Sequence, residues 1–256
     1  MRQKKEQPDL ILPNIIDYAQ LISLIRQRFS ANLGTWIVTL NSDIHRQLSA
    51  PESKLLLEKI QGKALITADG FPIKLLSSYV TGKEFKRVTG AGAIPMLIEI
   101  SVELGIPIIF AGGKFGDAAK AVQKLSLLHP TAKSKALELP FAESEVIASY
   151  IRSNIPFDLF ILFLGVGALK AEYVISELVE NYPKSIFIGC GAGISFFAGT
   201  IKRAPWYVRK LNLEWLFRLL LEPTRLFQRY IVNDFPHILR LLKMGRSKRQ
   251  ISKSDT

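Results

Sequence analysis

Short apolar runs alternate with longer segments of helical periodicity over the first 200 residues of the chain. Runs of uncharged, large apolar residues predict buried strands, and apolar residues that recur every three or four positions predict helices. Continuous apolar strands between helices are typical of a mostly parallel sheet with helices on both faces, an α/β fold. The predicted strands are 35–40, 64–67, 106–111, 158–164 and 185–188, and the predicted helices are 15–29, 53–60, 93–104, 116–129, 144–153 and 169–180.

The hydrophobic pattern changes near Thr200, where glycine-rich sequence gives way to basic helical sequence that contains tryptophan. Arg218, Arg225 and Arg229 would share one face of a continuous helix, although Pro223 is expected to kink or restart that helix. Two interpretations stay open. The segment is either a C-terminal core helix with a solvated side or a surface that contacts both anionic groups and lipid.

Positive charge is concentrated in the same C-terminal part. The formal net charge of the chain is +12. From Ile201 onward there are thirteen lysines and arginines and four aspartates and glutamates, so this segment contributes +9 of the total. Such a charge points to phosphate, nucleic acid or anionic lipid, and leucines and tryptophans at helical spacing disfavour nucleic acid. We therefore predict a Rossmann-like domain over 1–200 and a basic amphipathic helical appendage over 201–256, with a disordered tail beyond Met244.

The composition also limits the compartment in which the protein works. The one cysteine, Cys190, excludes an intramolecular disulfide framework and fits a reducing compartment. The basic start of the chain is not followed by the apolar stretch of a signal peptide. The longest nearly uncharged runs fall short of the ~20 apolar residues that span a bilayer. We expect a cytoplasmic protein that touches a membrane from one side.

Glycines follow three of the predicted strands. In an open α/β sheet, ligands bind at the carboxyl ends of the strands, because backbone amides and helix N-termini converge there on anionic groups. Tight turns also require glycine, but its repetition after three strands favours a nucleotide or phosphate cleft. Neither the dinucleotide-binding fingerprint nor the P-loop spacing is complete. The glycines concerned are Gly112, Gly113, Gly165, Gly167, Gly189 and Gly191.

Asp69 is the candidate catalytic residue. It lies just after the predicted strand at 64–67, at the expected ligand edge. A carboxylate there can accept a proton from an attacking hydroxyl, and partial burial would raise its pKa toward that task. The alternative is an Asp-Gly turn. Asn41 and Asp43 are expected in a turn, where they would hydrogen-bond sugar hydroxyls or cap the next helix.

Metal and nucleophilic chemistry are not expected. His45, His129 and His237 share no ligand spacing, and no Asp-X-Asp sequence occurs, so we predict no metal site. The Gly-X-Ser-X-Gly elbow is absent from the sequence, and Cys190 is interpreted as a small buried hydrophobe.

With these features together, the sequence resembles the bacterial WecG/TagA/CpsF family of glycosyltransferases from about Thr35 to Ile231. The most specific part is C-terminal: Arg203-Ala-Pro-Trp206, Leu213-Glu-Trp, Arg218-Leu and Glu222-Pro-Thr-Arg225. The other matching segments are Thr39-Leu-Asn41, Ala68-Asp-Gly70, Arg87-Val-Thr-Gly90, Phe110-Ala-Gly-Gly-Lys114, Leu164-Gly-Val-Gly-Ala-Leu-Lys170 with Glu172, and Gly189-Cys-Gly191 with Phe197-Ala-Gly199.

The resemblance implies an inverting glycosyltransferase of cell-surface polysaccharide synthesis. The donor would be a UDP-sugar, of N-acetylmannosamine, uronic or hexose type, and the acceptor an undecaprenyl-diphosphate-linked sugar. No metal or other cofactor would be bound, and the protein would be peripheral on the inner face of the bacterial cell membrane. A homo-oligomer is left open, and a nucleic-acid partner is not expected.

The resemblance also implies roles for individual residues. Asp69 would be the general base on the acceptor hydroxyl. The acceptor diphosphate or anionic lipid would meet Arg203, Arg218, Arg225 and Arg229, because guanidinium groups bind phosphates in a bidentate manner. The donor-binding residues would be Thr39, Asn41, Arg87, Thr89, Gly112, Gly113, Gly165, Gly167, Lys170, Glu172, Gly189 and Gly191.

Three polar groups that the family usually carries are missing. Ala171 stands where a glutamine is usual, Ser195 where an aspartate is usual, and Gly92 closes a segment that usually reads Gly-Ser-Asp. A lost hydrogen bond to a substrate hydroxyl can change specificity strongly. Either the donor differs or the activity is reduced, and the rival interpretation is a scaffold that binds lipid-linked glycan or partner enzymes.

Overall fold

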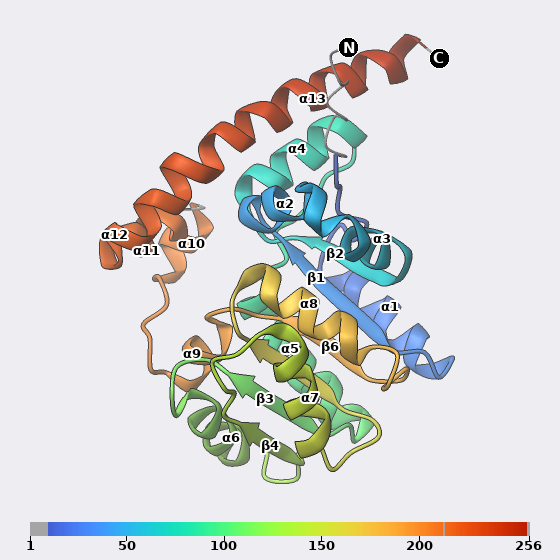
Figure 1. Cartoon of the computed structure of the whole chain (residues 1–256), viewed down its shortest axis with the longest axis vertical. Coiled ribbons are helices and arrows are strands. Elements are labelled where there is room, and N and C mark those ends of the chain that lie inside the picture. Colours follow the sequence, from blue (N-terminus) through green and yellow to red (C-terminus); the bar gives the residue numbers. More distant parts are fainter. Residues whose placement is uncertain (1–9, 212, 255–256) are drawn as a thin grey trace.

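The protein is built on one six-stranded parallel sheet. The computed structural model describes residues 10–211 and 213–254, and describes side chains over these ranges except at 209, 225 and 247–254. The strand order is β2-β1-β6-β5-β3-β4, and every pairing is parallel, which confirms the predicted α/β, Rossmann-like architecture (Figure 1). The strands are β1 (Thr35–Leu40), β2 (Ala64–Ala68), β3 (Ile108–Gly112), β4 (Ser134–Leu137), β5 (Ile161–Gly165) and β6 (Ile186–Gly189).

Each face of the sheet carries its own apolar core. Side chains alternate between the faces along a strand, so Trp36 and Val38 of β1 belong to one core and Ile37 to the other. The first core is covered by α2 (Ser42–Leu48), α3 (Lys54–Lys63), α4 (Phe71–Thr81), α7 (Ser144–Asn154) and α8 (Ala168–Leu178), with a short 3-10 turn, η1 (Pro51–Ser53). The second is covered by α1 (Tyr18–Ser30), α5 (Gly90–Leu104), α6 (Asp117–Leu128) and α9 (Gly193–Ala198).

The C-terminal segment forms a chain of helices that returns to the domain. Its elements are α10 (Trp206–Lys210), α11 (Glu214–Leu221), α12 (Pro223–Phe227), the π-helix η2 (Gln228–Asp234) and α13 (Phe235–Ser254). In Figure 1, α13 runs as a long helix past α4. Leu241 of α13 is buried in the first core, and Gly245 lies against Leu76 and Val80 of α4.

One expectation for this segment is confirmed and one needs correction. Pro223 restarts the helix, as expected, so Arg218 lies on α11 and Arg229 on η2. The tail beyond Met244 was predicted to be disordered, whereas α13 continues to Ser254. The basic residues and glutamine of this tail are good helix formers, and they extend a helix that is already anchored on α4.

Some local predictions also differ from the structure. The segment after β1 was expected to be a turn, yet Asn41 is the N-cap of α2, which starts at Ser42. The helix α4, the strand β4 and the helix α9 were not predicted. Within the described residues, no helix combines the length and apolarity needed to cross a membrane.

Candidate active site

The predicted glycines meet at the carboxyl edge of the sheet, at its topological switch point. The connection from β3 runs toward one edge of the sheet, to β4, and the connection from the neighbouring β5 runs in the opposite direction, to β6. Where connections diverge in this way, a crevice opens between the ends of the two strands. Gly112 and Gly165 are register partners, and the Gly113 N–H donates to the Gly165 carbonyl at 2.9 Å. Backbone carbonyls crowd this approach, so a Cβ at Gly112, where φ is 81°, would lie 3.1 Å from the Gly165 oxygen.

A pocket of about 530 Å³ lies at this point. Its walls include Gly112, Gly113, Gly165 and Lys170, all predicted to bind the donor. The Lys170 ammonium lies 5.6 Å from the centre of the Phe141 ring, which also lines the pocket. This volume is in the range of small-molecule binding sites. Because three of the lining residues are glycines without side chains, a ligand can come close to the backbone amides.

Asp69 lies one residue beyond β2, at the same edge. Its N–H donates to the Leu40 carbonyl at 2.9 Å, and its carboxylate accepts the Gly90 N–H at 3.4 Å, where α5 begins. Burial raises the pKa of Asp69 to about 6, while the Gly90 N–H and the charge of Arg87 counteract that rise. A carboxylate with such a pKa is ionised at neutral pH and is still basic enough to accept a proton.

Charged residues of the C-terminal segment lie near Asp69, and the charges of Glu214 and Arg218 act on it. Glu214 of α11 bridges two guanidinium groups, accepting from Arg87 at 2.9 Å and from Arg203 at 3.3 Å. Arg203 also donates to the Thr89 hydroxyl at 3.4 Å, and Thr89 is the N-cap of α5. The appendage therefore completes a charged cluster around the predicted base.

Arg218 belongs to the same region as this cluster. Its charge acts on Asp69, and its guanidinium lies 6.0 Å from the centre of the Phe196 ring, which Arg203 approaches to 5.9 Å. Two of the four predicted acceptor arginines thus lie close together near the candidate base. The side chain of a third, Arg225, lies outside the described residues.

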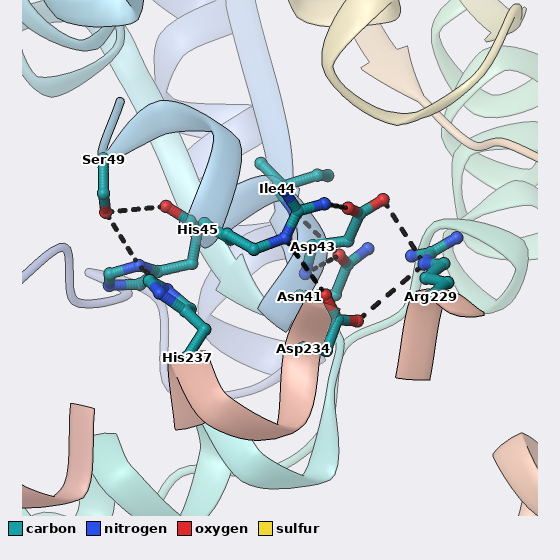
Figure 2. A network of polar contacts seen from close by, with 9 residues as sticks. Asn41, Asp43, Ile44, His45, Ser49, Arg229, Asp234 and His237 are labelled. Atoms are coloured by element: carbon teal, nitrogen blue, oxygen red, sulfur yellow. Dashed lines mark hydrogen bonds and ion pairs between the residues drawn. The ribbon is translucent and has the colours of Figure 1, made fainter. Parts of the chain in front are cut away.

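Arg229 lies in a different network, drawn in Figure 2. It pairs with Asp43 of α2 at 3.3 Å and with Asp234 at 3.9 Å, and Arg46 bridges the same two carboxylates. Burial raises the pKa of Asp234 to about 6, and the nearby Asp43 adds to the rise. The structure thus places Arg229 in the contact that attaches η2 to α2, apart from Arg218.

The same view includes Asn41 and a histidine pair. The Asn41 side-chain oxygen accepts the N–H groups of Asp43 and Ile44 at 3.1 and 3.0 Å, which is the capping alternative rather than a turn. Nδ1 of His45 and Nε2 of His237 lie 3.0 Å apart, so α13 is joined to α2 by a buried imidazole contact.

Two predicted donor-binding residues point into the protein interior. The Thr39 hydroxyl donates to the Gly189 carbonyl at 3.2 Å and is buried. Glu172 is fully buried, and its carboxyl accepts the Trp36 indole N–H at 2.7 Å. Burial raises the pKa of Glu172 to about 8, so the group is neutral at pH 7. Both side chains support the strands beneath the edge.

The three family departures each have a local partner. Ala171 is buried in the first core next to Gly189, and the buried Ser195 hydroxyl donates to the carboxylate of Asp117. Gly92 leaves room for the hydroxyl of Tyr18. Tyr18, Asp117 and Glu214 were not predicted as site residues, and only Glu214 lay within a motif of the resemblance.

No metal-binding cluster is found in the part of the chain that the structure describes: no three histidine, cysteine, aspartate or glutamate side chains are placed to share an ion. Cys190 is buried, and burial raises the pKa of its thiol to about 12. A thiol with that pKa stays protonated and is not a nucleophile at neutral pH.

Comparison with known proteins gives a family match over almost the whole chain. Residues 13–251 match the glycosyl transferase WecG/TagA/CpsF family, which is nearly the whole chain. The chain is similar to the N-acetylglucosaminyldiphosphoundecaprenol N-acetyl-beta-D-mannosaminyltransferase of Bacillus subtilis strain 168. The two are 24% identical over 214 residues, which cover 84% of this chain and 80% of the relative.

Proposed function

Because the chain belongs to the WecG/TagA/CpsF family of glycosyltransferases, we propose that it transfers a sugar from a UDP-sugar to an undecaprenyl-diphosphate-linked acceptor. The name of the Bacillus subtilis relative supports the acceptor class. The donor is proposed to carry a sugar of the N-acetylmannosamine, uronic or hexose type. The observation that carries the proposal is a basic carboxylate, Asp69, at the ligand edge of the sheet beneath a cluster of arginines.

In the proposed reaction Asp69 is the general base. The acceptor hydroxyl gives its proton to the Asp69 carboxylate as its oxygen attacks the anomeric carbon of the donor sugar. The bond from that carbon to the diphosphate breaks at the same time, so the configuration inverts and UDP leaves with the bonding electrons. The pKa of about 6 suits this step, because Asp69 starts ionised at neutral pH and can hold the proton afterwards.

The sheet order gives the donor a path from the pocket to the base. β2, which ends next to Asp69, and β5, which borders the pocket, are separated by β1 and β6. Three strand spacings span roughly 14 Å, a distance that an extended nucleoside diphosphate sugar can cover. We place the nucleotide in the glycine-floored pocket, the diphosphate across the ends of β5 and β6, and the sugar above β1.

The acceptor is proposed to enter from the side of the appendage. Arg203 and Arg218 lie there near Asp69, and guanidinium groups bind diphosphates well. We propose that such cations, together with backbone amides, balance the negative charge in place of a resident metal. Arg229 would have to leave Asp43 and Asp234 to take part.

Peripheral attachment to the inner face of the cell membrane belongs to the same proposal. Large apolar side chains are exposed along the appendage, among a marked excess of positive charge, and this combination suits an anionic lipid surface. The exposed residues include Trp206, Tyr207, Leu211, Trp215, Leu220, Leu221, Phe227 and Val232.

The test is release of UDP from a panel of UDP-sugars in the presence of a water-soluble, diphosphate-lipid-linked acceptor sugar. The proposal expects acceptor-dependent release with at least one donor. If UDP-sugars and acceptor bind but no donor yields UDP, the protein is a scaffold for lipid-linked glycan instead, and the catalytic proposal is wrong.

A further inference from the structure

Tyr18, the first residue of α1, holds both backbone polar groups of Thr89. The Thr89 N–H donates to the Tyr18 hydroxyl at 3.1 Å, and that hydroxyl lies 3.4 Å from the Thr89 carbonyl, to which it donates. The Tyr18 ring packs against the apolar core between the sheet and α5. One partly buried side chain therefore fixes a peptide segment that lies 71 positions further along the chain.

Thr89 is the residue at which the candidate base and the appendage meet. The next N–H, that of Gly90, is the one that donates to the Asp69 carboxylate. The Thr89 hydroxyl accepts the Gly92 N–H at 3.0 Å, which caps α5, and it also accepts from Arg203. A shift of Thr89 would therefore move the hydrogen-bond donor of Asp69 and the anchor of Arg203 together.

The Tyr18 hydroxyl occupies the space that a side chain at Gly92 would fill. A Cβ at position 92 would overlap the Tyr18 hydroxyl oxygen and would lie 2.8 Å from the Thr89 hydroxyl oxygen. The hydroxyl of Tyr18 can reach the Thr89 backbone only because residue 92 has no side chain. The family departure at this position thus has a counterpart in the tyrosine that occupies the space.

We propose that Tyr18 is a positioning residue for the transfer reaction: it holds Thr89 so that the Gly90 N–H stays on Asp69 and Arg203 stays beside them. This inference rests on the proposed function, because it assigns Asp69 the role of base. Within the described part of the chain, the Tyr18 hydroxyl is bonded to Thr89 and not to the Asp69 carboxylate, and Tyr18 does not line the pocket.

The test is Tyr18→Phe, which keeps the ring and removes the hydroxyl. The kcat should fall by about 5- to 10-fold with little change in the KM for the donor, since the lost bond acts on the catalytic group. The Gly90 N–H lowers the pKa of Asp69, so its loosening should raise that pKa above about 6. The acid limb of the pH–rate profile should therefore move to higher pH, by about 0.5 unit.

Tyr173→Phe is the matched control. It removes a hydroxyl that pairs with the Ser53 hydroxyl at 3.2 Å, away from Asp69. It should cost comparable stability and leave kcat and the pH profile unchanged. Gly92→Ala should reproduce the effect of Tyr18→Phe, and the double variant should be no worse than the poorer single variant, because both changes break the same contact.

Two outcomes would overturn the inference. One is a Tyr18→Phe enzyme with the kcat and pH profile of the Tyr173→Phe control. The other is an unchanged Asp69 pKa in Tyr18→Phe, measured by NMR titration of the carboxyl carbon, which requires no turnover. A wild-type protein without transfer activity would contradict the proposed function. The NMR titration would still show whether the Tyr18 hydroxyl keeps the Gly90 N–H on the Asp69 carboxylate.

Discussion

Desolvation raises the pKa values of both Asp69 and Glu172, and the positions of these two carboxyl groups give them different roles. Asp69 lies at the end of β2, beside the Gly90 N–H and near arginines. Glu172 lies on α8, which covers the first core, and its buried carboxyl accepts a hydrogen bond from the Trp36 indole N–H. Desolvation raises the pKa of each, but only Asp69 is at the edge where a substrate can reach it.

Glu172 gives a prediction about stability. Its pKa is about 8 in the folded protein and near 4.5 in the unfolded chain, so the folded state holds one more proton between these values. Stability therefore falls as pH rises through this window. Glu172→Gln is uncharged at every pH, so between about pH 6 and pH 9 its Tm should fall less than that of the wild type, by roughly a few degrees. Parallel Tm curves would show that Glu172 does not titrate in this way.

The sequence predicts the place of Asp69 but not the directions of other side chains. The strand-edge rule needs only the end of β2, which is local. Thr39 turns to the Gly189 carbonyl, and Glu172 meets Trp36 from 136 positions away. These contacts depend on which strands are neighbours, so a motif that contains such residues cannot distinguish a donor ligand from a structural support. Tyr18 was not predicted as a site residue, because its contact with Thr89 also joins distant parts of the chain.

At the scale of elements, the strands with continuous apolar runs were predicted well. Burial on both faces gives β1, β2, β3, β5 and β6 a signal that does not depend on their neighbours. β4 (Ser134–Leu137) lies at the sheet edge and is only partly buried, so its sequence lacks that run. α2 was interpreted as a turn because the sequence Asn41-Ser-Asp occurs both in turns and at helix N-caps. α4 was not predicted because Pro72, in its first turn, is equally common in turns.

The contact between α13 and α2 gives a prediction at this scale. Burial lowers the pKa of His45 to about 3 and of His237 to about 4, so both are neutral in the folded protein at pH 7. When the contact opens, each imidazole titrates near 6.5, and the open state takes up more protons as pH falls. The attachment should therefore weaken below about pH 6.5. The raised pKa of Asp234 works in the opposite direction and offsets only part of the effect.

Hydrogen exchange along α13, corrected for intrinsic rates, measures this weakening. Protection should fall between about pH 7 and pH 4.5, and His237→Gln should make the fall shallower because one titrating group is gone. His129→Gln, outside the contact, is the matched control. If His237→Gln and His129→Gln give the same pH dependence, the histidine pair does not control the attachment.

At the scale of the whole molecule, charge and exposed apolar surface lie on the same C-terminal segment. That segment also supplies Glu214 and Arg203 to the cluster around Asp69. A membrane-bound acceptor would therefore be presented to the base by the same segment that we propose contacts the lipid. The attachment of α13 to α2 and α4 holds this arrangement together.

Paired leucine variants test the proposed membrane surface in the whole chain. Leu220 and Leu221 of the appendage are 74% and 58% exposed, and Leu127 and Leu128 of α6 are 77% and 57% exposed. Replacing the first pair with serine should reduce sedimentation with anionic liposomes by about 10-fold, because apolar contact is lost at the lipid. The same change at the second pair should leave binding unaltered. Equal loss in both would place the lipid contact elsewhere.

The most direct measurement of the central claim is the rate of sugar transfer by Asp69→Asn, together with its affinity for the UDP-sugar. Asparagine can still accept the Gly90 N–H but cannot take a proton from the acceptor. We predict that transfer falls by about 10²- to 10⁴-fold while UDP-sugar binding changes by less than about 3-fold. Transfer near the wild-type rate by Asp69→Asn would contradict the assignment of Asp69 as the base.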